Sequence, residues 1–116
     1  MTSQIRLLTI NARRAEEAAT QAEAFANNND PIGAEIEAKA AASEAIEASA
    51  EWARINAHYF TTIRNTKDQK AWDRAERELE KARALATQTR IAANRAEEAM
   101  TRAINAEVKR NNPPNP

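Results

Sequence analysis

Alanine residues spaced three and four positions apart are the feature that most restricts how this chain can fold. The sequence holds 28 alanines in 116 residues. In its first part, a run with this spacing contains Ile5, Leu8, Ala12, Ala15, Ala19, Ala22 and Ala26. A second run contains Trp72, Ala75, Leu79, Ala82, Ala86, Thr89, Ala93, Ala96, Met100 and Ala103. An average spacing of about 3.5 is typical of α-helices that pack along a shared seam. Methyl groups in that seam let the helix axes approach closely.

The rest of the composition places the chain in the all-helical class. Glycine occurs once and cysteine never, and alanine, glutamate and arginine dominate, as in helical bundles. We expect an extended three-helix up-down-up antiparallel bundle with alanine-rich, coiled-coil-like seams. It would form one domain over residues 1–110, followed by a flexible Asn/Pro tail over 111–116. Because a buried alanine methyl contributes only about 0.8 kcal/mol, such a monomer would be thinly stabilised and would gain from self-association.

Turn-forming residues divide the chain into helices over about 3–26, 31–63 and 67–109. The three asparagines at 27–29 disfavour helix, and Asp30 before Pro31 is typical of a helix start. Thr66 and Gln69 fit a capping box at the start of the third helix. The alternative is that the second and third helices continue through residue 66 as one long rod.

Short connections favour an antiparallel arrangement of successive helices. The stretch 35–51 is mainly acidic and the stretch 81–110 is mainly basic. Folding the second helix back against the third would therefore bring opposite charges together, which favours this arrangement over others. The residues expected to be buried are Ile5, Leu8, Ala12, Ala15, Phe25, Ile36, Ile46, Ala50, Ala53, Leu79, Ala82, Ala86 and Met100.

The unequal helix lengths predict a surface at the second turn. At about 1.5 Å per residue, the first helix is too short to cover the other two, so their ends pair without it. Phe60 is expected to lie level with Trp72 there. The candidate protein interface is made of Tyr59, Phe60, Ile63 and Trp72. Exposed apolar ends of this kind commonly bind a partner, here a second copy of the chain or another helical protein. The alternative is that Met1, Ile5 and Leu7 fold over these rings and close the core.

The sequence offers no constellation for a catalytic, cofactor-binding or metal-binding site. Its one histidine, His58, has no histidine or cysteine four residues away to share a metal ion. Seventeen basic residues balance seventeen acidic ones, which argues against a nucleic-acid partner. Because neither a signal peptide nor an apolar stretch of about 20 residues for a membrane span is seen, a soluble, cytoplasmic protein is expected.

The predicted function is a non-catalytic structural or protein-interaction module that self-associates through helix packing near the second turn. The alternative is an amphipathic-helix protein that acts at a lipid surface, which alanine disfavours because its side chain buries little in acyl chains. A small-ligand carrier or an enzyme is a third interpretation, for which the sequence provides neither a site nor large residues to shape a cavity.

Overall fold

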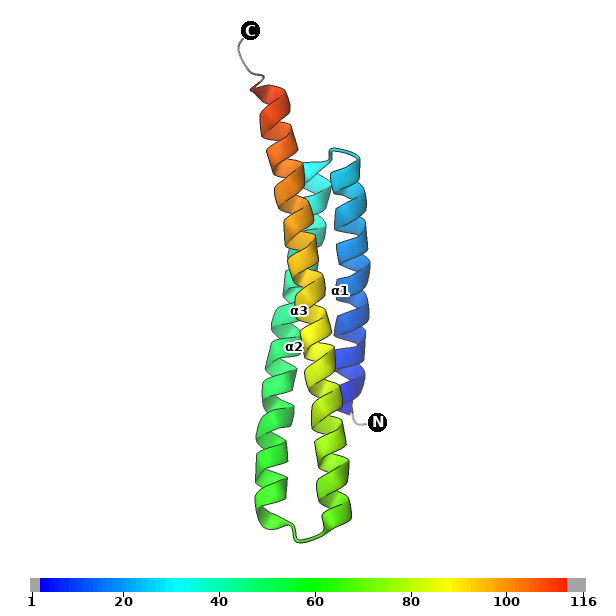
Figure 1. Cartoon of the computed structure of the whole chain (residues 1–116), viewed down its shortest axis with the longest axis vertical. Coiled ribbons are helices and arrows are strands. Elements are labelled where there is room, and N and C mark those ends of the chain that lie inside the picture. The colour runs from blue at the N-terminus through cyan, green and yellow to red at the C-terminus, as the bar shows by residue number, and fades with distance from the viewer. Residues whose placement is uncertain (1–2, 113–116) are drawn as a thin grey trace.

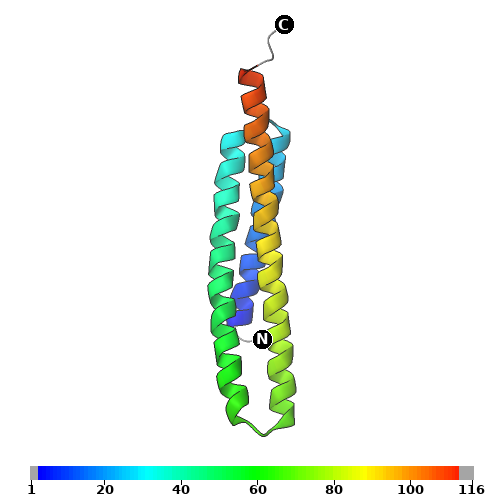
Figure 2. The same ribbon diagram turned by 60° about the vertical axis from the view of Figure 1, so that its left-hand side comes forward.

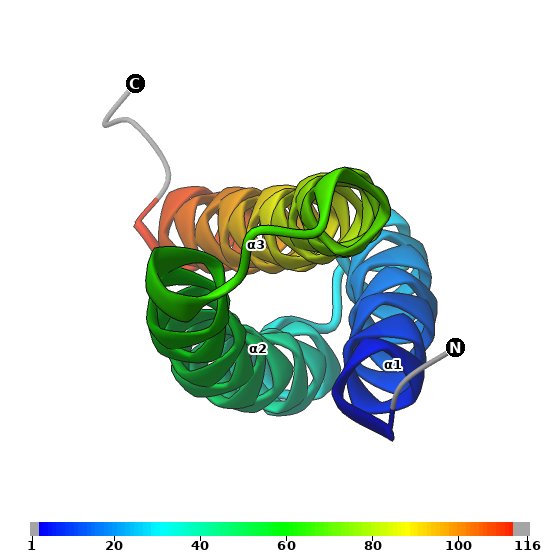
Figure 3. The same ribbon diagram turned by 90° about the horizontal axis from the view of Figure 1, so that it is seen from below.

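The computed structural model describes residues 3–112 and consists of three long helices. These are α1 (Ser3–Asn27), α2 (Pro31–Asn65) and α3 (Gln69–Asn111). They lie side by side in a rod of 75 × 21 × 16 Å, and the chain reverses direction at two short turns (Figures 1 and 2). Each helix contacts both others, and the end-on view shows them at the corners of a triangle (Figure 3). The all-α class is confirmed, and the alternative of one continuous rod through residue 66 is wrong.

The first turn begins α2 at the predicted residues. The carboxylate of Asp30 caps the helix by accepting a hydrogen bond from the N–H of Gly33 at 2.9 Å. Pro31 follows as the first helical residue, where no backbone donor is needed. Asn29 has a φ of 59°, in the left-handed region that asparagine tolerates better than most residues. Local residue preferences therefore account for this turn.

The second turn uses a different cap from the predicted one. Asp68 caps α3, and its carboxylate accepts a hydrogen bond from the N–H of Lys70 at 3.0 Å. Thr66 instead closes the end of α2. The side chain of Gln69 donates to Asp73 at 3.0 Å, within α3, rather than reaching back. The predicted capping box of Thr66 and Gln69 is therefore wrong, because the nearer carboxylate starts the helix two residues later.

The core has two parts of different composition. One is made only of alanines from all three helices, namely Ala15, Ala18, Ala19, Ala22, Ala38, Ala41, Ala92, Ala96 and Ala99. The other lies at the start of α1. It contains Ile5, Leu8, Ala48 and Ala82, and Trp52, Ile55 and Leu85 pack against it. No helix within residues 3–112 is both long enough and apolar enough to cross a bilayer.

The structure corrects the predicted core on α2. Of the predicted set, it buries Ile5, Leu8, Ala12, Ala15, Leu79 and Ala82, and it half-buries Phe25, Ala86 and Met100. Ile36 and Ile46 are 62% and 73% exposed, and Ala50 and Ala53 are also exposed, so these four predictions are wrong. The inner face of α2 carries Ala34, Ala38, Ala41, Ala45, Ala48, Trp52, Ile55 and Tyr59 instead. Alanines suit this face because α1 and α3 both approach it closely.

Polar contacts between helices join α1 to each of its neighbours. Arg95 on α3 contacts Glu16 at 2.7 Å and Glu23 at 2.6 Å, and these hydrogen bonds, that of Glu23 first, raise the pKa of its guanidinium. Buried Asn11 donates to Glu44 on α2 at 2.6 Å. Among residues 5–112, no ion pair within 4.0 Å joins α2 to α3. The opposite charges of α2 and α3 therefore act at longer range, where their effect is small.

Replacing Gly33 by alanine is expected to destabilise the protein. A Cβ at this buried position would lie 2.6 Å from Cγ and Cδ1 of Phe25, and 2.9 Å from the Asp30 carboxylate. The overlap should cost about 1–3 kcal/mol and outweigh the gain of about 1 kcal/mol from helix propensity. The measurement is urea unfolding of Gly33→Ala. In a Phe25→Ala background, which removes the ring, the same change should become neutral or favourable. A single variant more stable than the parent would contradict this packing.

Candidate functional site

The end of the rod near the second turn is formed by two helices. Ile5, at the start of α1, packs level with Ala48 on α2 and Ala82 on α3, so the last turns of α2 lie beyond α1 (Figures 1 and 2). The alternative in which the N-terminal residues cover the turn fails for Ile5, which packs beside Trp52 and Ile55. Met1 lies outside the described residues.

The four predicted interface residues fall into two environments. Ile63 is buried, and Trp72 is half-buried. The indole N–H of Trp72 donates a hydrogen bond to the carbonyl of Thr66 at 3.1 Å, which satisfies a backbone acceptor at the end of α2. Trp72 therefore helps to close the turn, and Ile63 is a buried residue of the monomer.

Tyr59 and Phe60 form the other pair. Their ring centroids are 5.6 Å apart and their planes meet at 80°, an edge-to-face contact within α2. Tyr59 is half-buried, whereas Phe60 is 59% exposed. The ring contact that Phe60 makes is thus with its neighbour in sequence rather than with Trp72. Of the four candidates, Phe60 offers the largest free apolar surface.

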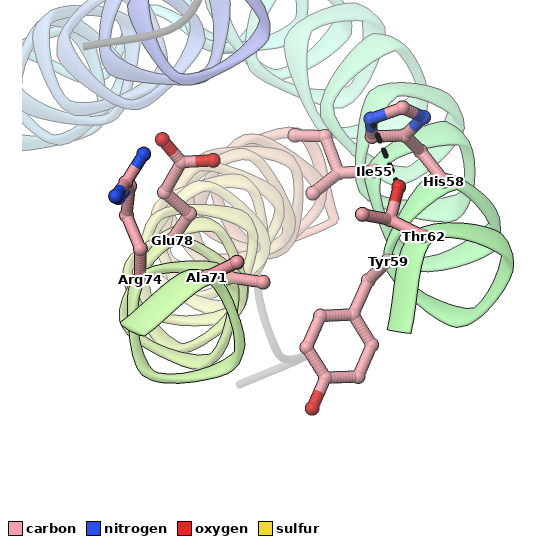
Figure 4. A pocket seen from close by; sticks show the side chains of 8 residues that line it. Ile55, His58, Tyr59, Thr62, Ala71, Arg74 and Glu78 are labelled. Carbon is pink, nitrogen blue, oxygen red and sulfur yellow. Dashed lines mark hydrogen bonds between the residues drawn. The ribbon is translucent and has the colours of Figure 1, made fainter. Parts of the chain in front are cut away.

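A small pocket of about 210 Å³ lies between α2 and α3 at this end (Figure 4). It is lined by Ile55, His58, Tyr59, Thr62, Ala71, Arg74, Ala75 and Glu78. Nε2 of His58 lies 3.4 Å from the hydroxyl of Thr62, one turn along the same helix. In the part of the chain that the structure describes, no three or more His, Asp or Glu side chains are grouped to hold a metal ion. The contact of His58 is thus a local one between two exposed side chains of α2.

Comparisons with protein-family models, with curated proteins and with solved structures give no match for this chain. The exposed residues themselves are therefore the basis for a functional proposal. The described residues carry seven large hydrophobic side chains that are exposed. Three are on α3, namely Ile91, Ile104 and Val108, and four are on α2, namely Ile32, Ile36, Ile46 and Phe60.

The four on α2 share one face of that helix. Together with the residues between them they form a series spaced by four and three positions, which we name the outer α2 stripe. It consists of Ile32, Ile36, Lys39, Ser43, Ile46, Ala50, Ala53, Ala57 and Phe60, and all nine are exposed. It is shifted by two positions from the buried series that starts at Ala34, so about 200° of helix rotation separates the two series. α2 therefore has heptad patterns on opposite sides, one of them without a partner in the monomer.

The outer α2 stripe is the feature that sequence reasoning missed. The sequence-based core includes Ile36, Ile46, Ala50 and Ala53 of this stripe, because 3-4 spacing alone does not tell which face of a helix is buried. The signal that could have revealed the stripe is a second series of residues with heptad spacing on the same helix. Beside the stripe, a shallow groove of about 470 Å³ runs between α2 and α3, and its apolar lining includes Ala42, Ile46, Ala93 and Met100.

Proposed function

We propose that this chain is a non-catalytic structural or protein-interaction module that self-associates through helix packing. In this proposal the chain is an up-down-up antiparallel bundle with alanine-rich, coiled-coil-like seams, and one face of α2 remains for a partner. The observation that carries the proposal is the outer α2 stripe. Ile32, Ile36, Ile46 and Phe60 are each more than half exposed on that single face. Apolar side chains gathered at heptad spacing on an exposed helix are typical of a helix-packing interface.

The energetics of the core support association. The larger of the two clusters is built of alanines alone, each worth about 0.8 kcal/mol when its methyl is buried. A fully buried isoleucine or phenylalanine is worth about 1.5–3 kcal/mol. The chain therefore keeps several of its largest apolar side chains outside the monomer core. Burying them against a partner would add stability that the monomer lacks, and this stabilisation would rise with the logarithm of the protein concentration.

The second turn contributes to this proposal through Phe60. It is the last member of the outer α2 stripe, and it is the exposed member of the predicted set of Tyr59, Phe60, Ile63 and Trp72. Aromatic side chains are enriched among interface residues whose truncation weakens binding strongly. The proposed interface thus extends from the turn along α2 rather than ending at the turn.

The test is the mass of the protein in solution, measured by light scattering after size exclusion at two concentrations. We expect the parent to be an oligomer at the higher concentration and to dissociate on dilution. Phe60→Ala should shift this dissociation to a higher concentration by about tenfold or more, with helicity by circular dichroism unchanged. A parent that remains a monomer at both concentrations would contradict self-association.

The lipid-surface alternative is tested in parallel by flotation with vesicles of phosphatidylcholine and phosphatidylglycerol. Lipid-surface helices have a polar face rich in lysine and arginine. The outer α2 stripe instead has Glu35, Glu47 and Arg54 beside it and Lys39 within it, so we expect no flotation. Flotation of a monomeric protein would favour the lipid interpretation over self-association.

A further inference from the structure

We propose that the outer α2 stripe binds the outer α2 stripe of a second copy of this chain, with the two α2 helices antiparallel about a two-fold axis near residue 50. This inference rests on the proposed self-association and specifies its surface, its occupant and its orientation. A two-fold axis makes one patch serve both copies, as in most homodimers.

The distribution of large and small residues along the stripe fits this arrangement. The proposed axis lies beside Ala50 and Ala53, and the larger side chains of Ile46 and Phe60 lie on either side of this small pair. Two helices that cross at alanines can approach closely there. An axis near residue 50 pairs residues from about 41 to 60 of one copy with the same residues of the other, so the stripe from Ser43 to Phe60 overlaps in the two copies. Phe60 of one copy then lies level with residues 36–43 of the other and is covered by them.

The charges beside the stripe favour the antiparallel orientation. Glu47 and Arg54 lie on the same flank, one heptad apart, and both are exposed. In an antiparallel pair centred between them, Glu47 of each copy faces Arg54 of the other. In a parallel, in-register pair, Glu47 would face Ala42 and Arg54 would face Ser49 of the other copy, so neither would gain a partner of opposite charge. Arg54 also forms an ion pair with buried Glu51 on its own helix.

On the opposite flank of the stripe, no charged residue lies near the centre of the proposed interface. It consists of Glu35, Ala42, Ser49 and Asn56, so only its first residue is charged. The exposed apolar residues of α3 do not offer an equivalent surface, because Ile91 stands thirteen positions from Ile104 with no such stripe between them. Ile91, 51% exposed, therefore serves as a matched control for Ile46.

The first part of the test compares Ile46→Asp with Ile91→Asp by sedimentation equilibrium. We expect Ile46→Asp to raise the dimer dissociation constant by on the order of a hundredfold, because it places a carboxylate in the centre of the interface. Ile91→Asp should leave the dissociation constant within about threefold of the parent, since a charge at an exposed site away from the interface costs little. Both variants should keep the helicity of the parent.

The second part determines the orientation by disulfide cross-linking, which the absence of native cysteine makes clean. Ala50→Cys should form a cross-linked dimer on mild oxidation, because the two residues lie within about 7 Å of each other near the axis. Ile36→Cys should not, since about 40 Å separates the two copies of this residue in an antiparallel pair. Cross-linking of both variants with equal yield would show a parallel pair and overturn the inference.

The third part exchanges the flanking charges. Glu47→Arg alone and Arg54→Glu alone should each weaken the dimer by about tenfold, and their combination in one chain should restore it. Mixing the two single variants should give a heterodimer tighter than either homodimer. A dimer that survives Ile46→Asp and all charge changes but is lost in Phe60→Ala would overturn the α2 pairing while leaving self-association intact. A parent that is monomeric at every concentration would overturn both proposals.

Discussion

Replacing Ala82 by leucine is expected to lower the free energy of unfolding by about 1–3 kcal/mol, whereas the same change at Ala53 should alter it by less than about 0.5 kcal/mol. Ala82 is fully buried beside Ile5, Leu8 and Ala48. The extra carbon atoms have no space there unless the helices move apart. Ala53 is exposed on the outer face of α2, so a leucine there extends into solvent in the monomer.

The measurement is urea unfolding of both variants, at a dilution at which the parent is monomeric. From the sequence alone, both alanines are expected to be buried where alanine lines the seams of two packed helices, so either leucine should overpack its site. The structure separates the two positions, so the pair tests which face of α2 is buried. Equal destabilisation by the two leucines, or a higher midpoint for Ala82→Leu, would contradict this assignment.

Replacing Trp72 by alanine is expected to destabilise the monomer by about 2–3 kcal/mol, somewhat less than a fully buried tryptophan would. The side chain is half-buried, and its N–H donates to the carbonyl of Thr66 at the end of α2. Its loss removes both apolar contact and a hydrogen bond that closes the turn. Phe60→Ala, by contrast, removes a ring that is 59% exposed and should cost the monomer less than about 1 kcal/mol.

Two measurements separate these roles. Thermal unfolding at low concentration reports the monomer, and sedimentation reports association. Trp72→Phe is the control, because it keeps a smaller aromatic ring and loses the donor, and the loss of the hydrogen bond alone costs about 1 kcal/mol. If Trp72→Ala left the monomer as stable as the parent but abolished association, Trp72 would belong to the interface rather than to the turn.

Much of the helical framework follows from local sequence. The asparagines at 27–29, then Asp30 and Pro31, end one helix and start the next by their own backbone preferences. The second turn was less well predicted, because Thr66 and Asp68 are both good caps and only their distance to the following N–H groups selects Asp68. Helix existence is thus a short-range property, whereas the exact cap depends on which of two nearby acceptors is closer.

The candidate site was predictable in its position and not in its details. The shorter α1 follows from the position of the first turn, so a two-helix end near Tyr59 and Trp72 could be expected from the sequence. The separate roles of Ile63, Phe60 and Trp72 could not, because each depends on how side chains of α2 and α3 meet. The packing of Phe25 over Gly33 is likewise a contact between two helices, which no local preference specifies.

The sequence by itself determined that this protein is helical, where its turns lie, and that Ile5, Leu8, Ala12 and Ala15 of α1 are buried. Tertiary structure decided which of two series on α2 faces inward. Both have heptad spacing, and the outer one contains more isoleucine. The alanines of the inner series are buried because two other helices must approach α2 closely along most of its length. Such packing depends on how the side chains of all three helices fit together, which the sequence of one helix alone does not specify.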